Sequence, residues 1–122
     1  MKIVAFTDLK AWQEGHALVL SIYSITKKFP REEIFCLISQ MRRAVVSITS
    51  NIAEGFGRPT NKEKQRFYSM ALASLTELQN QIIISRDVGY ISNEEFSSLF
   101  DNTITVQKIT NGLIKSSKNL TA

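Results

Sequence analysis

The sequence predicts an all-α protein, an antiparallel, up-down-up-down, left-handed four-helix bundle that forms a single domain over residues 1–122. Apolar residues recur three and four positions apart along most of the chain, whereas no run alternates with hairpin signals as strands do. Only two prolines and five glycines interrupt the sequence. The joints are therefore only about 3 to 7 residues long, which favours antiparallel neighbours. The 43% hydrophobic content is enough for one core, and the length leaves no room for a second domain.

The first helix is predicted at about residues 8–28. Asp8 is a good N-cap, because its carboxylate can accept hydrogen bonds from the first turn. Phe29-Pro30 ends the helix, because the residue before a proline avoids the helical conformation. The apolar side of this helix would consist of Leu9, Trp12, Leu18 or Val19, Ile22, Ile25 and Phe29.

The second helix is predicted at about residues 31–54. Gly55 and Gly57 follow it and supply the backbone conformations that a C-cap and a turn need. One stripe alternates four and three residues apart, like the seam of a bundle helix, and is expected to face the core. This stripe contains Ile34, Ile38, Met41, Val45, Ile48 and Ile52.

The third and fourth helices are predicted at about residues 61–88 and 93–118. Capping boxes mark both starts, one from Thr60 to Glu63 and one from Ser92 to Glu95. Gly89 ends the third helix. The inward residues would be Tyr68, Ala71, Leu75, Leu78 and Ile82 on the third helix and Phe96, Leu99, Val106 and Leu113 on the fourth.

A second apolar arc on the second helix predicts a subunit interface. Phe35, Val46 and Ala53 group about 100° away from the core stripe on a helical wheel. Arg42 lies at the edge of this arc, where its stem could rest on a neighbouring subunit and its guanidinium could fork onto a carboxylate. Contact with nucleic acid and simple exposure are the other roles open to Arg42.

Polar residues form a third line on the same helix, consisting of Gln40, Ser47, Asn51 and Glu54. This line is either an ordinary solvated face or a polar seam against another helix. In a seam, buried polar groups must find hydrogen-bonding partners.

The joint between the second and third helices is rich in basic residues. Arg58, Lys62, Lys64 and Arg66 are opposed only by Glu63, within a chain whose net charge is +4. The simple interpretation is a solvated first turn that helps solubility. The functional interpretation is a phosphate-binding patch, which a cyclic assembly would repeat. Cations at a helix N-terminus oppose the helix dipole, which is a small argument for the functional interpretation.

The sequence lacks the residue combinations that the enzyme classes considered below require. We therefore predict no catalytic residues, no metal site and no cofactor. A di-iron bundle needs two Glu-x-x-His pairs, but the chain has one histidine, His16. The run from Gly55 to Arg58 follows a helix and lacks the spacing of a phosphate-binding loop. A serine hydrolase would need a base near Ser47 or Ser74, and His16 alone does not make that arrangement credible.

Several segments together resemble the bacterial four-helix bundle protein family, first described from reading frames inside intervening sequences of 23S rRNA genes. They are Gln40-x-Arg42-Arg43-Ala44-x-x-Ser47, Asn51-Ile52-Ala53-Glu54-Gly55, Ala73-Ser74-Leu75-x-Glu77-Leu78 and Gly89-Tyr90-Ile91. Ala73 stands where a glycine is usual, and Gln79 where a glutamate is usual.

The resemblance implies a bacterial bundle protein that assembles into a cyclic homo-oligomer, most often a pentamer, with a positively charged surface. A related branch resembles the accessory protein of diversity-generating retroelements, which binds a reverse transcriptase and nucleic acid. For the branch of intervening-sequence proteins, the resemblance implies no established activity.

These observations predict a non-enzymatic, oligomeric bundle that binds structured RNA, or a nucleic-acid-processing partner, through its basic surface. The alternative is a structural or adaptor protein that has a protein partner only. We expect a cytoplasmic protein without membrane contact, because the apolar run Ile3 to Phe6 is too short for a signal peptide or a membrane span. The lone Cys36 is expected to be inert packing.

Overall fold

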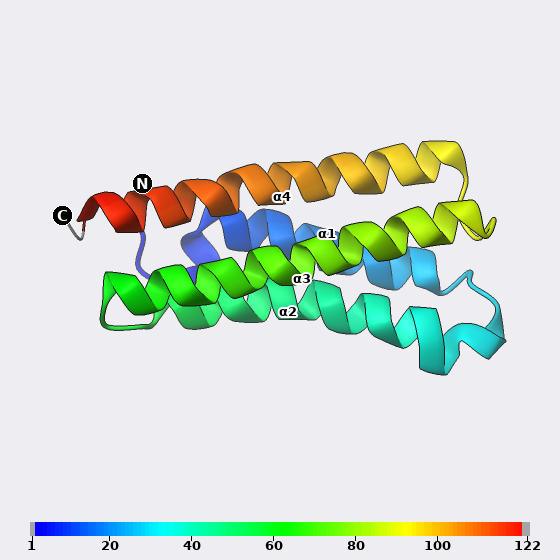
Figure 1. The fold of residues 1–122 in the computed structure, drawn as a ribbon, viewed down its shortest axis with the longest axis horizontal. Helices are drawn as coiled ribbons and strands as arrows, with labels where there is room; N and C mark the ends of the chain where they lie inside the picture. The colour runs from blue at the N-terminus through cyan, green and yellow to red at the C-terminus, as the bar shows by residue number, and fades with distance from the viewer. Residues whose placement is uncertain (1, 121–122) are drawn as a thin grey trace.

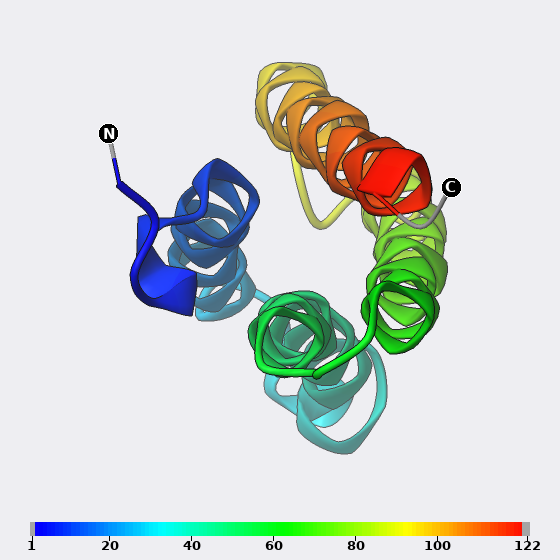
Figure 2. The same ribbon diagram turned by 90° about the vertical axis from the view of Figure 1, so that its left-hand side faces the viewer.

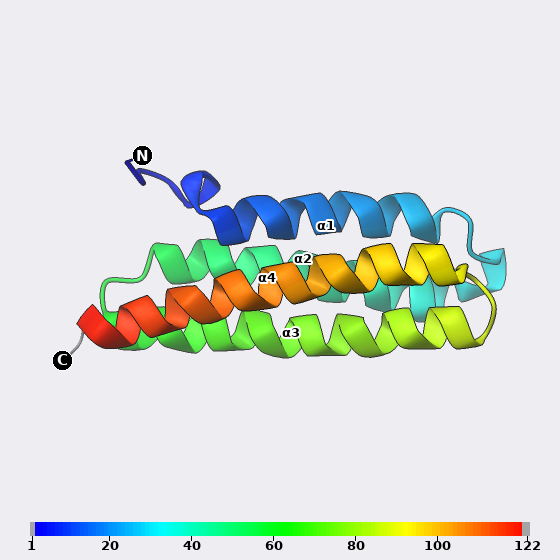
Figure 3. The same ribbon diagram turned by 90° about the horizontal axis from the view of Figure 1, so that it is seen from above.

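The computed structural model describes residues 2–120. Four long helices run alternately in opposite directions (Figure 1): α1 (Lys10–Thr26), α2 (Ser39–Phe56), α3 (Asn61–Asp87) and α4 (Asn93–Leu120). Each helix packs on its neighbour in sequence, and α4 closes the bundle against α1 (Figures 2 and 3). No strand occurs in this range. The predicted all-α, up-down-up-down bundle is therefore confirmed.

The core contains most of the residues that the helical periodicity assigns to it. The predicted inward residues of α3 are all buried, and on α4 Leu99 and Val106 are buried. Short side chains allow close approach between α1 and α2, since a β carbon at Gly15 would lie 3.0 Å from Cγ2 of Thr49. The largest fully buried apolar side chains are Leu18, Ile22, Met41, Ile48, Ile52, Leu75, Leu78 and Ile82.

The start of α1 differs from the prediction. A short 3-10 helix, η1 (Phe6–Asp8), precedes α1, and Leu9 occupies its N-cap without a side-chain hydrogen bond. The Asp8 carboxylate accepts hydrogen bonds from the N–H groups of Val4 and Ala5 at 2.9 and 3.0 Å. These two bonds lower the pKa of Asp8. The prediction of Asp8 as the N-cap is wrong because its carboxylate caps the turn before the helix.

The segment before α2 is not the continuous helix predicted over residues 31–54. A 3-10 turn, η2 (Arg31–Glu33), leads into a π-helical turn, η3 (Ile34–Ile38), in which Cys36 has φ −121° and ψ −107°. A π turn holds more residues than an α turn and therefore changes the face on which the preceding residues lie. Ile34 is 44% exposed, so its assignment to the core is wrong, whereas Leu37 and Ile38 are buried.

Glycines act differently at the two ends of α3. Gly89, at the C-terminal end, has φ 87° and ends the helix as predicted. Before α3, Gly55 lies within α2, and Gly57 is the C-cap with φ −81°, so neither supplies a left-handed conformation. Thr60 caps α3 by accepting the Glu63 N–H at 3.2 Å.

Within residues 2–120, no helix is both long and apolar enough to cross a membrane.

Candidate nucleic-acid interface

The joint between α2 and α3 holds the predicted basic cluster, and its geometry depends on one tight contact. The ring of Tyr68 packs against Gly55, so closely that a β carbon on Gly55 would lie 2.7 Å from Cε1 of the ring. Tyr68 is buried, and burial raises the pKa of its hydroxyl. This contact brings the first turns of α3 against the last turn of α2.

Lys64 is turned back onto the end of α2. Its ammonium group donates hydrogen bonds to the carbonyls of Phe56 and Gly55 and lies 5.4 Å from the centre of the Phe56 ring. The last carbonyls of a helix lack partners within the helix and favour a nearby cation. Lys64 is therefore a tertiary cap of α2, a role that leaves its ammonium partly occupied.

Arg58 is also engaged within the chain. Its guanidinium lies 4.4 Å from the centre of the Phe67 ring, and Nη2 lies 3.3 Å from Oε2 of Glu54. Both charged side chains of this ion pair are substantially exposed, so the pair contributes little to stability. Phosphate could compete with Glu54 for the outer face of the guanidinium.

Lys62 and Arg66 differ from these two residues. Both side chains are exposed, and neither forms an ion pair within the described range. Positive groups that are held by no carboxylate are available to neutralise phosphate. Of the four predicted residues, these two therefore carry the most accessible charge.

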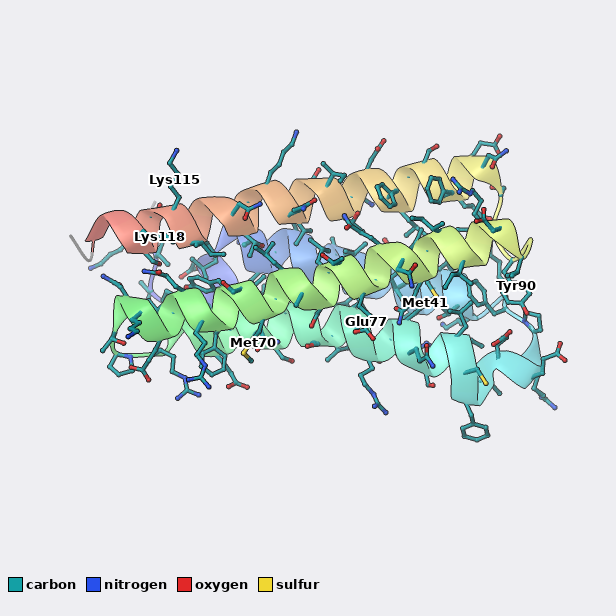
Figure 4. All side chains as sticks on the ribbon, viewed as in Figure 1. Met41, Met70, Glu77, Tyr90, Lys115 and Lys118 are labelled. Carbon is teal, nitrogen blue, oxygen red and sulfur yellow. The ribbon has the colours of Figure 1, made fainter. Side chains whose placement is uncertain are left out.

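The fold adds basic residues that the sequence does not place beside the cluster. Up-down-up-down topology brings the start of α1 and the end of α4 to the end of the bundle that holds the α2–α3 joint (Figure 1). Lys115 and Lys118 lie at this end, and Lys115 extends away from the bundle (Figure 4). We call this region the basic end; its basic residues are Lys2, Lys10, Arg58, Lys62, Lys64, Arg66, Lys115 and Lys118.

Acidic residues are fewer at the basic end than at the opposite end. The basic end holds Asp8, Glu14, Glu54 and Glu63, and the opposite end holds Glu32, Glu33, Asp87, Glu94, Glu95 and Asp101. Two cations at the opposite end are paired, Lys28 with Glu95 and Arg86 with Asp87. The hydrogen bond from Lys28 lowers the pKa of Glu95. The charge of the bundle is therefore polarised along its length.

The predicted interface arc of α2 is exposed. Phe35, on the π turn, is 91% exposed, Val46 is 39% exposed, and Ala53 is half-buried. Arg42 is held on α1: its Nε donates to Oγ1 of Thr26 at 3.0 Å, and its guanidinium lies 4.6 Å from the centre of the Tyr23 ring. Arg42 is thus pre-positioned at the rim of the arc.

The predicted polar line divides into two parts. Ser47 Oγ lies 2.8 Å from Ser74 Oγ on α3, and Asn51 Nδ2 donates to the carbonyl and the hydroxyl of Ser47 at 2.9 and 3.1 Å. Gln40 and Glu54 are exposed. Ser47 alone bonds across to α3, Asn51 supports Ser47 from within α2, and Gln40 and Glu54 lie on the solvated face.

No metal-binding cluster emerges from the described residues. No group of three or more His, Cys, Asp and Glu side chains in that range could hold a metal ion. The imidazole of His16 stacks on Trp12, with ring centres 4.7 Å apart. The described arrangement at the basic end can attract and contact anions.

Comparisons with known proteins agree with this fold. The family model described as 23S rRNA-intervening sequence protein matches residues 7–112. A crystal structure from Bacteroides thetaiotaomicron, described as a protein with unknown function from the S23 ribosomal protein family, superimposes with a TM-score of 0.80. The sequences are 20% identical, and the match covers 86% of this chain and 95% of the other. A search of curated proteins found no match.

Proposed function

The chain belongs to the 23S rRNA-intervening sequence protein family, and we propose that it is a non-enzymatic, oligomeric bundle that binds structured RNA through its basic end. The observation that carries this proposal is that exposed cations on separate helices lie at the same end of the bundle. Lys62 and Arg66 on α3 share this end with Lys115 on α4. None of the three has a carboxylate partner in the part of the chain that the structure describes.

Phosphate groups are the ligand that this surface fits best. Exposed ammonium and guanidinium groups gain affinity for nucleic acid mainly by releasing the counterions condensed on phosphates. Such contacts carry no base information, so binding would be sequence-tolerant, and preference would come from the shape of the RNA. Phe56 and Phe67 lie under Lys64 and Arg58 and support those cations, which leaves little aromatic surface for base stacking.

Oligomerisation would multiply the basic end. Phe35, just before α2, and Val46, on α2, are exposed apolar side chains, and a different surface of the next subunit would cover them in a ring. A pentamer is the form that the family resemblance implies. Five basic ends on one assembly would bind a folded RNA at several points, so the avidity of the assembly would exceed the affinity of one bundle.

The exposure of Phe35 also favours a second candidate function, an adaptor that binds only a protein. A large apolar side chain that is 91% exposed is typical of a surface that a partner covers. A partner protein that processes nucleic acid would fit both candidate functions. In either case, the cytoplasm is the compartment that we propose.

A salt titration of binding to a structured RNA separates these functions. Phosphate contacts make the logarithm of the affinity fall linearly with the logarithm of the salt concentration, by about 0.7 to 0.9 for each contact. An RNA-binding bundle shows this slope with no partner present. A protein adaptor shows no RNA binding even at low salt.

A further inference from the structure

A pocket lies where the end of α1 meets the distorted segment before α2, at the end of the bundle opposite the basic end (Figure 1). Its volume is about 470 Å³, which falls in the range of about 300 to 1,000 Å³ that small-molecule sites occupy. The lining residues are Thr26, Lys27, Phe29, Arg31, Ile34, Ile38, Ser39 and Arg42.

The polar part of this lining is cationic. Lys27, Arg31 and Arg42 contribute to it, and no acidic side chain does. None of these three cations forms an ion pair in the described residues. Glu33 is close to Arg31 in the sequence, but its carboxylate does not pair with that cation. It accepts hydrogen bonds from Tyr90 Oη at 2.8 Å and from the Leu37 N–H at 3.3 Å.

Arg42 is fixed in the pocket wall before any ligand arrives. Its Nε donates to Oγ1 of the buried Thr26, and its Nη2 donates to the carbonyl of Tyr23 at 3.4 Å. Tyr23 also supports the flat face of the guanidinium. The N–H groups that these bonds do not use can donate to an anion. A guanidinium that is already immobilised loses little entropy when it binds.

The apolar part of the lining depends on the π turn. Ile34, which a regular helix would place in the core stripe, instead lies 44% exposed in the pocket wall, beside buried Phe29 and Ile38. The irregular backbone at Cys36 produces this arrangement. A residue held in a rare backbone conformation, such as Cys36, costs free energy, and such residues cluster at functional sites. The unpaired cations and the apolar wall that the kink exposes thus line one pocket.

We propose that this pocket binds a small organic anion, in which a carboxylate or phosphate is attached to an apolar body. The anionic group would lie among Lys27, Arg31 and Arg42, and the apolar body would lie against Phe29, Ile34 and Ile38. This site is separate from the proposed RNA surface and goes beyond the function proposed for that surface.

Titration calorimetry of the full chain tests the proposal with matched probes. Phenyl phosphate and phenylacetate carry the proposed groups, phenethylamine and benzyl alcohol replace the anion with a cation and a neutral group, and inorganic phosphate lacks the apolar body. We expect both aromatic anions to bind at least about tenfold more tightly than the other three, which corresponds to about 1.4 kcal/mol. Equal binding of benzyl alcohol, or no binding of either aromatic anion at millimolar concentration, would contradict the proposal.

Three variants locate the site. Arg31→Gln removes an exposed cation from the lining, and Ile34→Trp fills the pocket from its exposed wall; both should weaken binding of phenyl phosphate at least about fivefold. Lys108→Gln removes an exposed charge from α4, outside the lining, and should leave binding unchanged. Equal weakening by Lys108→Gln would indicate a diffuse effect of net charge and would overturn the site. Unchanged binding in both pocket variants would overturn it as well.

Discussion

Tyr68 packs directly on the backbone of Gly55, and this contact fixes the joint between α2 and α3. A β carbon at position 55 would lie 2.7 Å from Cε1 and 2.9 Å from Cδ1 of the buried ring. Gly55→Ala should therefore destabilise the protein by about 1 to 3 kcal/mol, the usual cost of overpacking. This cost exceeds the gain of about 1 kcal/mol that alanine brings to a helix interior. Urea unfolding followed by circular dichroism measures the difference.

Gly112 provides the matched control. It lies exposed within α4, and a β carbon there would meet no atom within 4 Å. Gly112→Ala should stabilise the protein by about 0.5 to 1 kcal/mol, because only the helix propensity changes. Changes of the same sign in both variants would show that the Tyr68 contact does not determine the role of Gly55.

Replacing Lys64 should destabilise the protein more than replacing Lys62, although the two residues are only two positions apart. Lys64→Ala removes the cation that caps the carbonyls of Phe56 and Gly55, and should cost about 1 kcal/mol. Lys62→Ala removes an exposed side chain and should change stability by less than about 0.5 kcal/mol. The same unfolding measurement compares them. Equal effects would argue that Lys64 does not cap α2 in solution.

Glu95 should make stability depend on pH in the acid range. Its pKa is lowered from 4.5 by hydrogen bonds from Lys28 and from the N–H of Ser92. A lowered pKa in the folded state stabilises the protein above the unfolded pKa, and this contribution is lost as the pH falls through the folded value. Glu95→Gln should therefore be less stable than the parent at pH 7, and the difference should shrink as the pH falls below about 4.5. A difference that stays constant from pH 7 to pH 3 would contradict the proposed cause.

Much of the fold follows from local signals in the sequence. The capping box is complete at Ser92 and Glu95, which exchange two hydrogen bonds at 2.9 and 3.0 Å. Gly89 ends α3 because its φ is positive. The π turn could not be predicted, because the apolar residues of 34–38 fit a regular helix equally well. Glu33, which supports that turn, bonds to Tyr90, and only the folded chain brings these two residues together.

Contacts between helices explain the glutamine at position 79. They also explain why only some residues of the basic cluster have free charges. The hydroxyl of Thr103 donates to the Phe100 carbonyl at 2.6 Å and accepts from Nε2 of Gln79 at 3.0 Å. A glutamate at position 79 would have no proton to donate when ionised, so the amide fits this contact. The sequence identifies the cluster of Arg58, Lys62, Lys64 and Arg66 as basic. It cannot show that two of them, Arg58 and Lys64, have partners within the chain.

The apolar surface of α2 should control assembly. Val46 is already 39% exposed in the single chain, so Val46→Glu should leave the bundle folded while placing a charge in the proposed contact between subunits. Light scattering after gel filtration should show an oligomer for the parent and a monomer for the variant. Leu20→Glu, at an exposed apolar position on α1, should keep the oligomer. A parent mass near 13.8 kDa at micromolar concentration would contradict oligomerisation.

RNA binding through the basic end should depend on Lys62 and Arg66, and a comparison of matched variants tests this dependence. The double variant Lys62→Ala/Arg66→Ala removes exposed cations that cap no helix, and Arg43→Ala/Lys108→Ala removes the same charge from exposed positions elsewhere. The measurement is a salt titration of binding to a structured RNA by the parent and both variants. The first variant should flatten the slope of log affinity against log salt by about 1.4 to 1.8, the value for two lost phosphate contacts. The second variant should keep the parent slope. Equal slopes in all three proteins, or no binding by the parent at low salt, would show that the basic end does not bind RNA.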